Sequence, residues 1–169
     1  MLDRYGNNWN RAELEEFARS VESLYGIPAG GLSALIAQES AWNPQAESPV
    51  GAQGLAQFMP PTAEEWDVDP WDPLQSIEGA GKYLAWLRSQ LPSWTAALAA
   101  YNYGIGNVKR RITEAGHVDI SRLPKETRDY IAKLAPAFGE DPSGLSPAGV
   151  QVSPLLIAAG AAIVWWGVS

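Results

Sequence analysis

Residues 31–44 read GLSALIAQESAWNP. This stretch predicts a short apolar helix with a carboxylate at its end. Leu32, Leu35 and Ile36 recur at helical spacing, and Glu39 follows them by seven, four and three residues. Positions with these separations share one face of a helix. Glu39 is therefore expected to point where the apolar side chains point, at the end of a rigid element.

The predicted surroundings of Glu39 favour its protonated form. A carboxyl group on an apolar face loses solvation when it ionises, and the C-terminus of a helix carries the negative end of the helix dipole. Both effects raise the pKa, as a general acid near neutral pH requires. A glutamate at a helix end is more often simply solvated, so the motifs around Glu39 must decide between the two interpretations.

Most of the chain reads as helices separated by turn residues, so the predicted fold class is mostly α with at most a minor β element. Asn10 and Gly26 are a cap and a stop for the first helix, and Asp72 followed by Pro73 caps a long one. Residues 51–59 suit a minor strand or a bent turn before a short helix. The other expected helices open at Pro28 and cover residues 94–102, 108–114 and 124–138.

Composition limits the class of protein. A chain of 169 residues, 46% of them hydrophobic, can bury one core. The net charge of −7 argues against a nucleic-acid partner, since nucleic-acid affinity rests on clustered basic residues, and the basic run 109–111 reads as a solvated helix face. Without cysteine, and with His117 as the one histidine, the sequence offers no thiolate or histidine metal site. We expect no metal and no cofactor.

The two ends of the chain differ in character. Residues 1–10 contain no apolar run, so no secretory signal peptide is expected. Residues 155–168 read LLIAAGAAIVWWGV, without a charge. A helix from Val150 to this end would be about 28 Å long, close to the roughly 30 Å of a bilayer's hydrocarbon core. We expect a C-terminal transmembrane helix; the alternative is a terminal helix packed on the protein's own core or on a partner subunit.

Four motifs follow one another in the chain, and their order and spacing carry more information than any one of them. The motifs are ESAWNP at 39–44 with Ser48, GAQGLAQFMP at 51–60, AYNYG at 100–104 and ETRDY at 126–130. Together they resemble the catalytic domain of the soluble lytic transglycosylases, over roughly residues 21–138. The resemblance implies a lysozyme-like helical fold.

Two positions depart from the family pattern. Ala56 stands where methionine is usual, and Tyr103 stands where alanine is usual. These departures concern the shape of the sugar subsites rather than the acid.

The resemblance implies cleavage of the β-1,4 bond between N-acetylmuramic acid and N-acetylglucosamine without water, which leaves a 1,6-anhydromuramoyl end. Glu39 would protonate the leaving oxygen and then accept the proton of the muramoyl 6-hydroxyl. Other acidic residues close in sequence, among them Glu47 and Glu64, read better as solvated. By position, the family match gives as substrate-binding residues Ser48, Gln57, Met59, Tyr101, Asn102, Glu126 and Tyr130.

The expected organisation is a lysozyme-like domain at 1–139, a Pro/Ser/Gly-rich linker at 140–153 and a membrane anchor at 154–169. The expected partners are peptidoglycan glycan strands, a membrane and other virion proteins, in a phage particle that acts at the bacterial periplasm or cell envelope. A wall-remodelling subunit of a secretion apparatus is the alternative setting. Two other functions stay open: a wall-binding or assembly module without turnover, and a muramidase that uses water.

Overall fold

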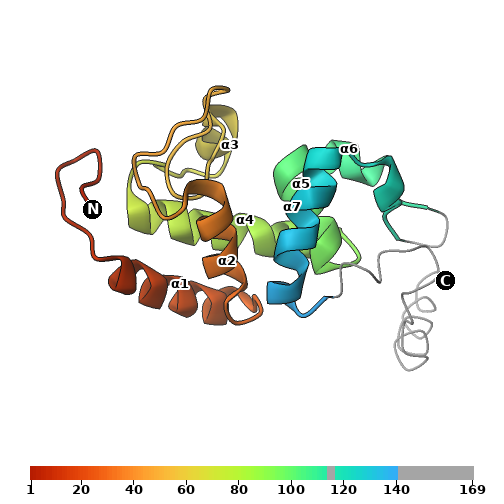
Figure 1. The fold of residues 1–169 in the computed structure, drawn as a ribbon, viewed down its shortest axis with the longest axis horizontal. Coiled ribbons are helices and arrows are strands. Elements are labelled where there is room, and N and C mark those ends of the chain that lie inside the picture. Colours follow the sequence, from red (N-terminus) through yellow and green to blue (C-terminus); the bar gives the residue numbers. More distant parts are fainter. Residues whose placement is uncertain (114–116, 141–169) are drawn as a thin grey trace, which may run out of the picture.

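The computed structural model describes residues 1–113 and 117–140. Helices dominate this part of the chain, as expected, and short 3-10 turns stand before and after α7 (Figure 1). In chain order they are α1 (Arg11–Tyr25), α2 (Gly31–Ser40), α3 (Pro60–Glu65), α4 (Pro73–Gln90), α5 (Trp94–Tyr103), α6 (Ile105–Lys109), η1 (Ile120–Arg122), α7 (Lys125–Leu134) and η2 (Ala135–Phe138).

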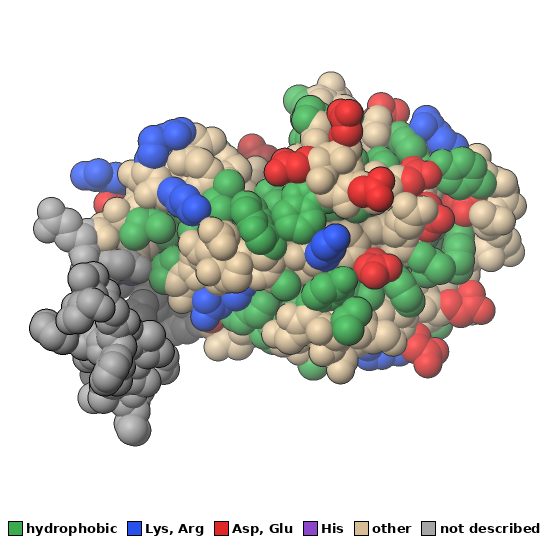
Figure 2. All heavy atoms as spheres, turned by 180° about the vertical axis from the view of Figure 1, so that it is seen from behind, with side chains coloured by type: hydrophobic (Ala, Val, Ile, Leu, Met, Phe, Trp, Pro, Cys, Tyr) green, Lys and Arg blue, Asp and Glu red, His purple; other side chains and the backbone are tan. Residues whose placement is uncertain are grey.

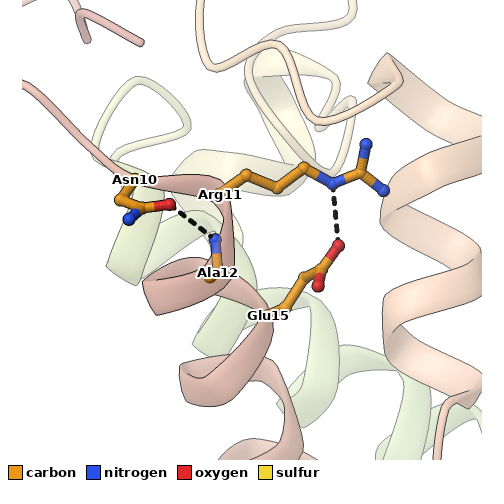
Figure 3. Close-up of polar contacts among 4 residues, drawn as sticks. All are labelled: Asn10, Arg11, Ala12 and Glu15. Atoms are coloured by element: carbon orange, nitrogen blue, oxygen red, sulfur yellow. Dashed lines mark hydrogen bonds and ion pairs between the residues drawn. The ribbon is translucent and has the colours of Figure 1, made fainter.

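Local side chains determine where α1 begins. The Asn10 side chain accepts a hydrogen bond from the Ala12 amide, and the Glu13 side chain reaches back to the Asn10 amide. This reciprocal pair satisfies amides that have no partner inside the helix. Across the first turn of the helix, Arg11 and Glu15 form an ion pair of 2.7 Å on the surface (Figure 3).

α4 is the central helix of the fold. It runs behind α2 from the side that carries α1 and α3 toward α5 and α7 (Figure 1), and it packs against α1, α2 and α5. Asp72 caps it by accepting from the Leu74 and Gln75 amides, as the sequence predicted. Its buried side chains include Ile77, Ala80, Leu84 and Leu87. α4 thus ties the two sides of the molecule together.

α7 returns across the molecule to α2. It packs against α5 and also contacts α2, which ends in Glu39. Residues far apart in the sequence therefore meet where α2, α5 and α7 come together (Figure 1).

Three predicted helix boundaries were wrong. α2 begins at Gly31 rather than at Pro28, because Gly30 takes a left-handed conformation as its N-cap. The helix expected over residues 108–114 is instead α6, which begins directly after Gly104, and Ile112 beyond it forms an isolated bridge with Val118. The predicted helix to Phe138 ends as an α-helix at Leu134; Pro136, which has no amide hydrogen, lies in the 3-10 turn that follows.

The extended structure in the described ranges consists of isolated bridges. Gln53 pairs with both Glu47 and Phe58, which folds residues 47–58 into a bent loop, as expected for a minor β element. Within residues 1–113 and 117–140, no helix combines the length and the apolar character needed to cross a bilayer. Apart from Glu140, the expected linker and the expected anchor at 154–169 lie outside the described residues.

Candidate active site

Glu39 lies in the last turn of α2, half-buried, with one hydrogen bond to a distant helix. The Tyr130 hydroxyl on α7 donates to Glu39 Oε1 over 2.6 Å, across 91 residues of sequence. Burial raises the pKa of Glu39 to about 7, and the Tyr130 hydrogen bond opposes the rise. Near neutral pH this carboxyl therefore exists in both its protonated and ionised forms, so it can donate and accept a proton.

A hollow of about 440 Å³ opens beside Glu39. Three of the sequence-predicted residues line it with Glu39: Asn102 at the end of α5, and Glu126 and Tyr130 on α7. Asp129 lies there too, but the Lys125 ammonium, 2.5 Å away, lowers the pKa of Asp129 and keeps it ionised. Glu126 is exposed, whereas burial raises the pKa of Glu39, so Glu39 is the carboxyl in this hollow that is suited to donate a proton.

A second hollow, of about 200 Å³, adjoins the first because Asn102 lines both. Gln57, Met59 and Tyr101 line this second hollow. Together the two hollows collect seven of the eight residues named from sequence. The surface between α3 and the side of α5 and α7 is rich in hydrophobic side chains (Figure 2).

Tyr101 fastens the loop of residues 51–59 to α5. Its hydroxyl donates to the carbonyl oxygen of Ala56 over 2.9 Å. Burial and the nearby Glu39 charge raise the pKa of Tyr101 well above its ordinary value, so the hydroxyl stays protonated and can donate. The contact uses the backbone of Ala56, so it does not depend on the methionine that the family usually has at this position. The side chain of Ala56 is fully buried.

Gln57 and Asn102 are also held by hydrogen bonds. The Gln57 side-chain amide donates to the carbonyl oxygens of Ala46 and Gly54, over 3.1 and 2.9 Å, which holds the loop closed on itself. The Asn102 Oδ1 accepts from the hydroxyl of Thr127 on α7 over 2.8 Å. These contacts fix the positions of both side chains before any ligand arrives.

Ser48 is the one predicted residue outside the two hollows. It lies half-buried in the bent loop, where its hydroxyl oxygen accepts from the Ala52 amide over 2.9 Å. The nearby acidic residues that the sequence suggested were solvated are exposed: Glu47, Glu64, Glu65 and Asp67. In the ranges that the structure describes, no group of three or more His, Cys, Asp or Glu side chains is placed to hold a metal ion.

Sequence reasoning missed Glu22, a buried carboxylate on α1. Its oxygens accept from the Gly30 amide over 2.8 Å and the Ser33 amide over 3.1 Å, at the N-terminus of α2. A carboxylate is favourable at that end of a helix, where amides are unpaired. Glu22 thus holds the end of α2 opposite Glu39. The signal was available, since Glu22 follows Ala18 by four residues on the buried face.

Replacing Tyr130 with phenylalanine is expected to raise the pKa of Glu39 above 7. The hydrogen bond stabilises the ionised carboxylate, so losing it favours the proton. The measurement is the titration of the Glu39 side-chain carbon followed by NMR. Tyr5→Phe is the matched control, since Tyr5 donates to Asp69 instead. A lower or unchanged pKa in Tyr130→Phe would mean that the hydrogen bond does not act on Glu39 in solution.

Known proteins match part of this chain, and the family match covers the site from Glu39 to the end of α5 but stops before α7. The family model described as "Transglycosylase SLT domain" matches residues 16–123. Among curated proteins, membrane-bound lytic murein transglycosylase F of Pasteurella multocida is 42% identical over 95 residues, which are 50% of this chain and 19% of that protein. Membrane-bound lytic murein transglycosylase F 2 of Alkalilimnicola ehrlichii is 39% identical over 115 residues, 63% of this chain and 24% of that protein.

Solved structures match the fold as well. A 70-kDa soluble lytic transglycosylase in complex with bulgecin A superposes with a TM-score of 0.64 and 30% identity, over 76% of this chain and 25% of that one. An inactive glutamate-to-glutamine mutant of the lytic transglycosylase Slt from Pseudomonas aeruginosa gives a TM-score of 0.59 and 25% identity, over 72% of this chain and 22% of that one. The chain spans about a fifth to a quarter of these proteins. Since the family model matches well over half of it, the chain belongs to the transglycosylase SLT domain family.

Proposed function

We propose that this domain is a peptidoglycan lytic transglycosylase, with Glu39 as its single catalytic acid and base. One observation carries the proposal: a carboxyl with a pKa of about 7 lies beside a hollow in a domain of this family. A general acid works best when its pKa lies near the working pH. The murein transglycosylases that the chain resembles support glycan as the substrate.

In the first step, protonated Glu39 donates its proton to the oxygen that links the two sugars. The bond from that oxygen to the anomeric carbon breaks, the bonding electrons stay with the leaving oxygen, and positive charge develops on the anomeric carbon and the ring oxygen. Glu39 is now a carboxylate beside that charge. The Tyr130 hydroxyl, 2.6 Å from Glu39, stabilises this form.

In the second step, the muramoyl 6-hydroxyl attacks the anomeric carbon and loses its proton to Glu39. A ring-closing oxygen–carbon bond forms, and Glu39 returns to its protonated state. The reaction needs one carboxyl group that alternates between acid and base, and a pKa of about 7 suits both tasks. A second carboxylate to activate water is not required.

The two hollows divide the substrate between them in this proposal. Glu126 and Asn102 contact the sugar beside Glu39, whereas Gln57, Met59 and Tyr101 contact the next part of the strand. Met59 is 42% exposed and offers an apolar surface to a sugar ring. Ser48, whose hydroxyl holds the loop, remains a predicted contact to an N-acetyl group.

The experiment that tests this function is mass spectrometry of the muropeptides released from purified peptidoglycan by the full chain. Products lighter by one water than the hydrolytic ones are expected, because the 6-hydroxyl replaces water as the nucleophile. Products with reducing ends would instead identify a muramidase that uses water. A folded chain that binds glycan and releases nothing would favour the binding-module alternative.

We also propose a setting for the enzyme: a membrane-associated domain delivered by a phage particle, which opens the wall locally during genome entry. The uncharged run at 155–168 supports the membrane association, as does the description "membrane-bound" of its relatives. Presence of the chain in purified particles tests the setting. Absence from them would favour the secretion-apparatus alternative.

A further inference from the structure

Three aromatic side chains form a contiguous cluster on one side of the second hollow. Tyr83 and Trp86 of α4 stack with ring centroids 5.9 Å apart and an interplanar angle of 16°. The Trp66 ring, at the end of α3, meets both edge-on, with centroids 5.1 Å from Tyr83 and 5.5 Å from Trp86. We call these three residues the aromatic shelf.

Core packing does not account for the whole shelf. Trp86 is 38% exposed, whereas Trp42, which fills the core, is 1% exposed. Burying a large apolar side chain is worth about 1.5 to 3 kcal/mol, so an aromatic ring left open beside a cleft is a candidate ligand contact. Figure 2 shows hydrophobic side chains gathered where the side of α5 and α7 meets the part that carries α3.

The aromatic shelf adjoins the second hollow. Tyr83 itself lines the second hollow, and its ring centroid lies 5.5 Å from that of Tyr101. On the far side of the shelf, Trp66 lines a third hollow of about 280 Å³. Neighbouring side chains therefore link the surroundings of Glu39, through Tyr101 and the shelf, to the third hollow.

The third hollow supplies polar groups next to the aromatic rings. Gln75, Glu78 and Lys82 line it, and the Lys82 ammonium lies 5.8 Å from the Trp66 ring centroid. A sugar ring has apolar C–H faces and a rim of hydroxyl and N-acetyl groups, so flat aromatic faces bordered by donors and acceptors match it. A purely apolar ligand would strip water from Glu78 and Lys82 without replacing their hydrogen bonds.

We propose that the aromatic shelf is a distal subsite for the same glycan strand. A β-1,4-linked N-acetylamino sugar beyond those held in the two hollows stacks on Trp86, and groups of the third hollow hydrogen-bond its rim. This inference rests on the proposed function, because it takes the occupant to be the substrate strand. It predicts that the enzyme distinguishes substrates by length.

The test compares Trp86→Ala and Trp86→Gln with the full wild-type chain on soluble glycan of two lengths. Under this proposal a tetrasaccharide is short enough to occupy the two hollows alone, whereas a strand of eight or more sugars also reaches the shelf. We expect KM for the long strand to rise about tenfold with kcat unchanged, which corresponds to about 1.4 kcal/mol. KM for the tetrasaccharide is expected to stay the same, and Trp86→Phe should restore the long-strand KM to within about twofold.

Leu24→Ala is the matched control, because Leu24 is a 69% exposed apolar residue on α1. It should leave both KM values unchanged. Equal long-strand KM values for wild type and both Trp86 variants would overturn the subsite, as would an equal rise on both substrates. If the wild type cleaves neither substrate, the proposed function fails. The subsite is then tested separately, by calorimetry that measures how tightly wild type and the Trp86 variants bind the uncleaved long strand. Weaker binding by the Trp86 variants supports the subsite, and equal binding overturns it.

Discussion

Replacing Glu39 with glutamine is expected to lower the rate of glycan cleavage about a thousandfold, the usual scale for losing a general acid and base. Glutamine has nearly the shape of glutamate, and its carbonyl oxygen can still accept the hydrogen bond from Tyr130. It can neither protonate the leaving oxygen nor accept the proton of the 6-hydroxyl. The measurement is the initial rate of muropeptide release from purified peptidoglycan.

The matched control for this variant is Glu16→Gln, an exposed glutamate on α1 that should leave the rate unchanged. Glu126→Gln tests the other glutamate of the same hollow. We expect it to weaken binding and to retain kcat, because Glu126 is proposed to hold substrate. Near-normal cleavage by Glu39→Gln together with a thousandfold loss in Glu126→Gln would move the catalytic acid to α7.

Loss of the fold would not explain an inactive Glu39→Gln variant, because glutamine relieves a stability cost. The pKa of Glu39 rises from 4.5 to about 7 on folding, so between these values the folded chain binds more protons than the unfolded one. The contribution of Glu39 to stability therefore falls as the pH rises from 4.5 through 7. Between pH 4 and pH 8, Glu39→Gln should gain up to about 3 kcal/mol of unfolding free energy relative to wild type. Urea unfolding at both pH values measures this gain.

Local chemistry made the helix boundaries at Asn10, Gly26 and Asp72 predictable. A cap acts on amides or carbonyls within about four residues, so the signal and its effect lie together in the sequence. The predicted break between the helices at 94–102 and 108–114 was wrong in extent, because the glycines there, Gly104 and Gly106, also fit at the start of a helix and inside it. Gly104, with φ of +86°, is both the residue at which α5 ends and the cap from which α6 begins, a conformation open to glycine.

The features of the candidate site that depend on one side chain and its neighbours in sequence were predictable. The contacts between side chains from distant helices were not. The apolar spacing before Glu39 predicted a partly desolvated carboxyl, and burial is the largest cause of its raised pKa. Its hydrogen bond to Tyr130 joins α2 and α7 across 91 residues, and no local pattern encodes that pairing. The same holds for Asn102 with Thr127 and for the shelf, whose members come from α4 and the end of α3.

Replacing Gly54 with alanine is expected to destabilise the domain by about 4 kcal/mol or more, at the severe end of single substitutions. A β-carbon at this position would lie 1.7 Å from the carbonyl oxygen of Pro70 and 2.7 Å from the carbonyl carbon. Both atoms belong to the backbone, so no side-chain rotation relieves the clash. The φ of +72° adds strain, because side chains rarely adopt that conformation.

Relief of the clash would require the loop to move away from Pro70, and the candidate site would move with it. The Gly54 amide donates to Ala46 over 2.9 Å, and the Gly54 carbonyl accepts from the Gln57 side chain. Gly51→Ala is the matched control, since Gly51 also has a positive φ, of +87°, but has open space where the β-carbon would lie. We expect it to cost about 1 kcal/mol, from the backbone conformation alone. Urea denaturation compares the stability of the two variants. Equal losses of stability would mean that close packing against Pro70 does not hold the loop. The rate of glycan cleavage should fall together with stability in Gly54→Ala and should not fall in Gly51→Ala.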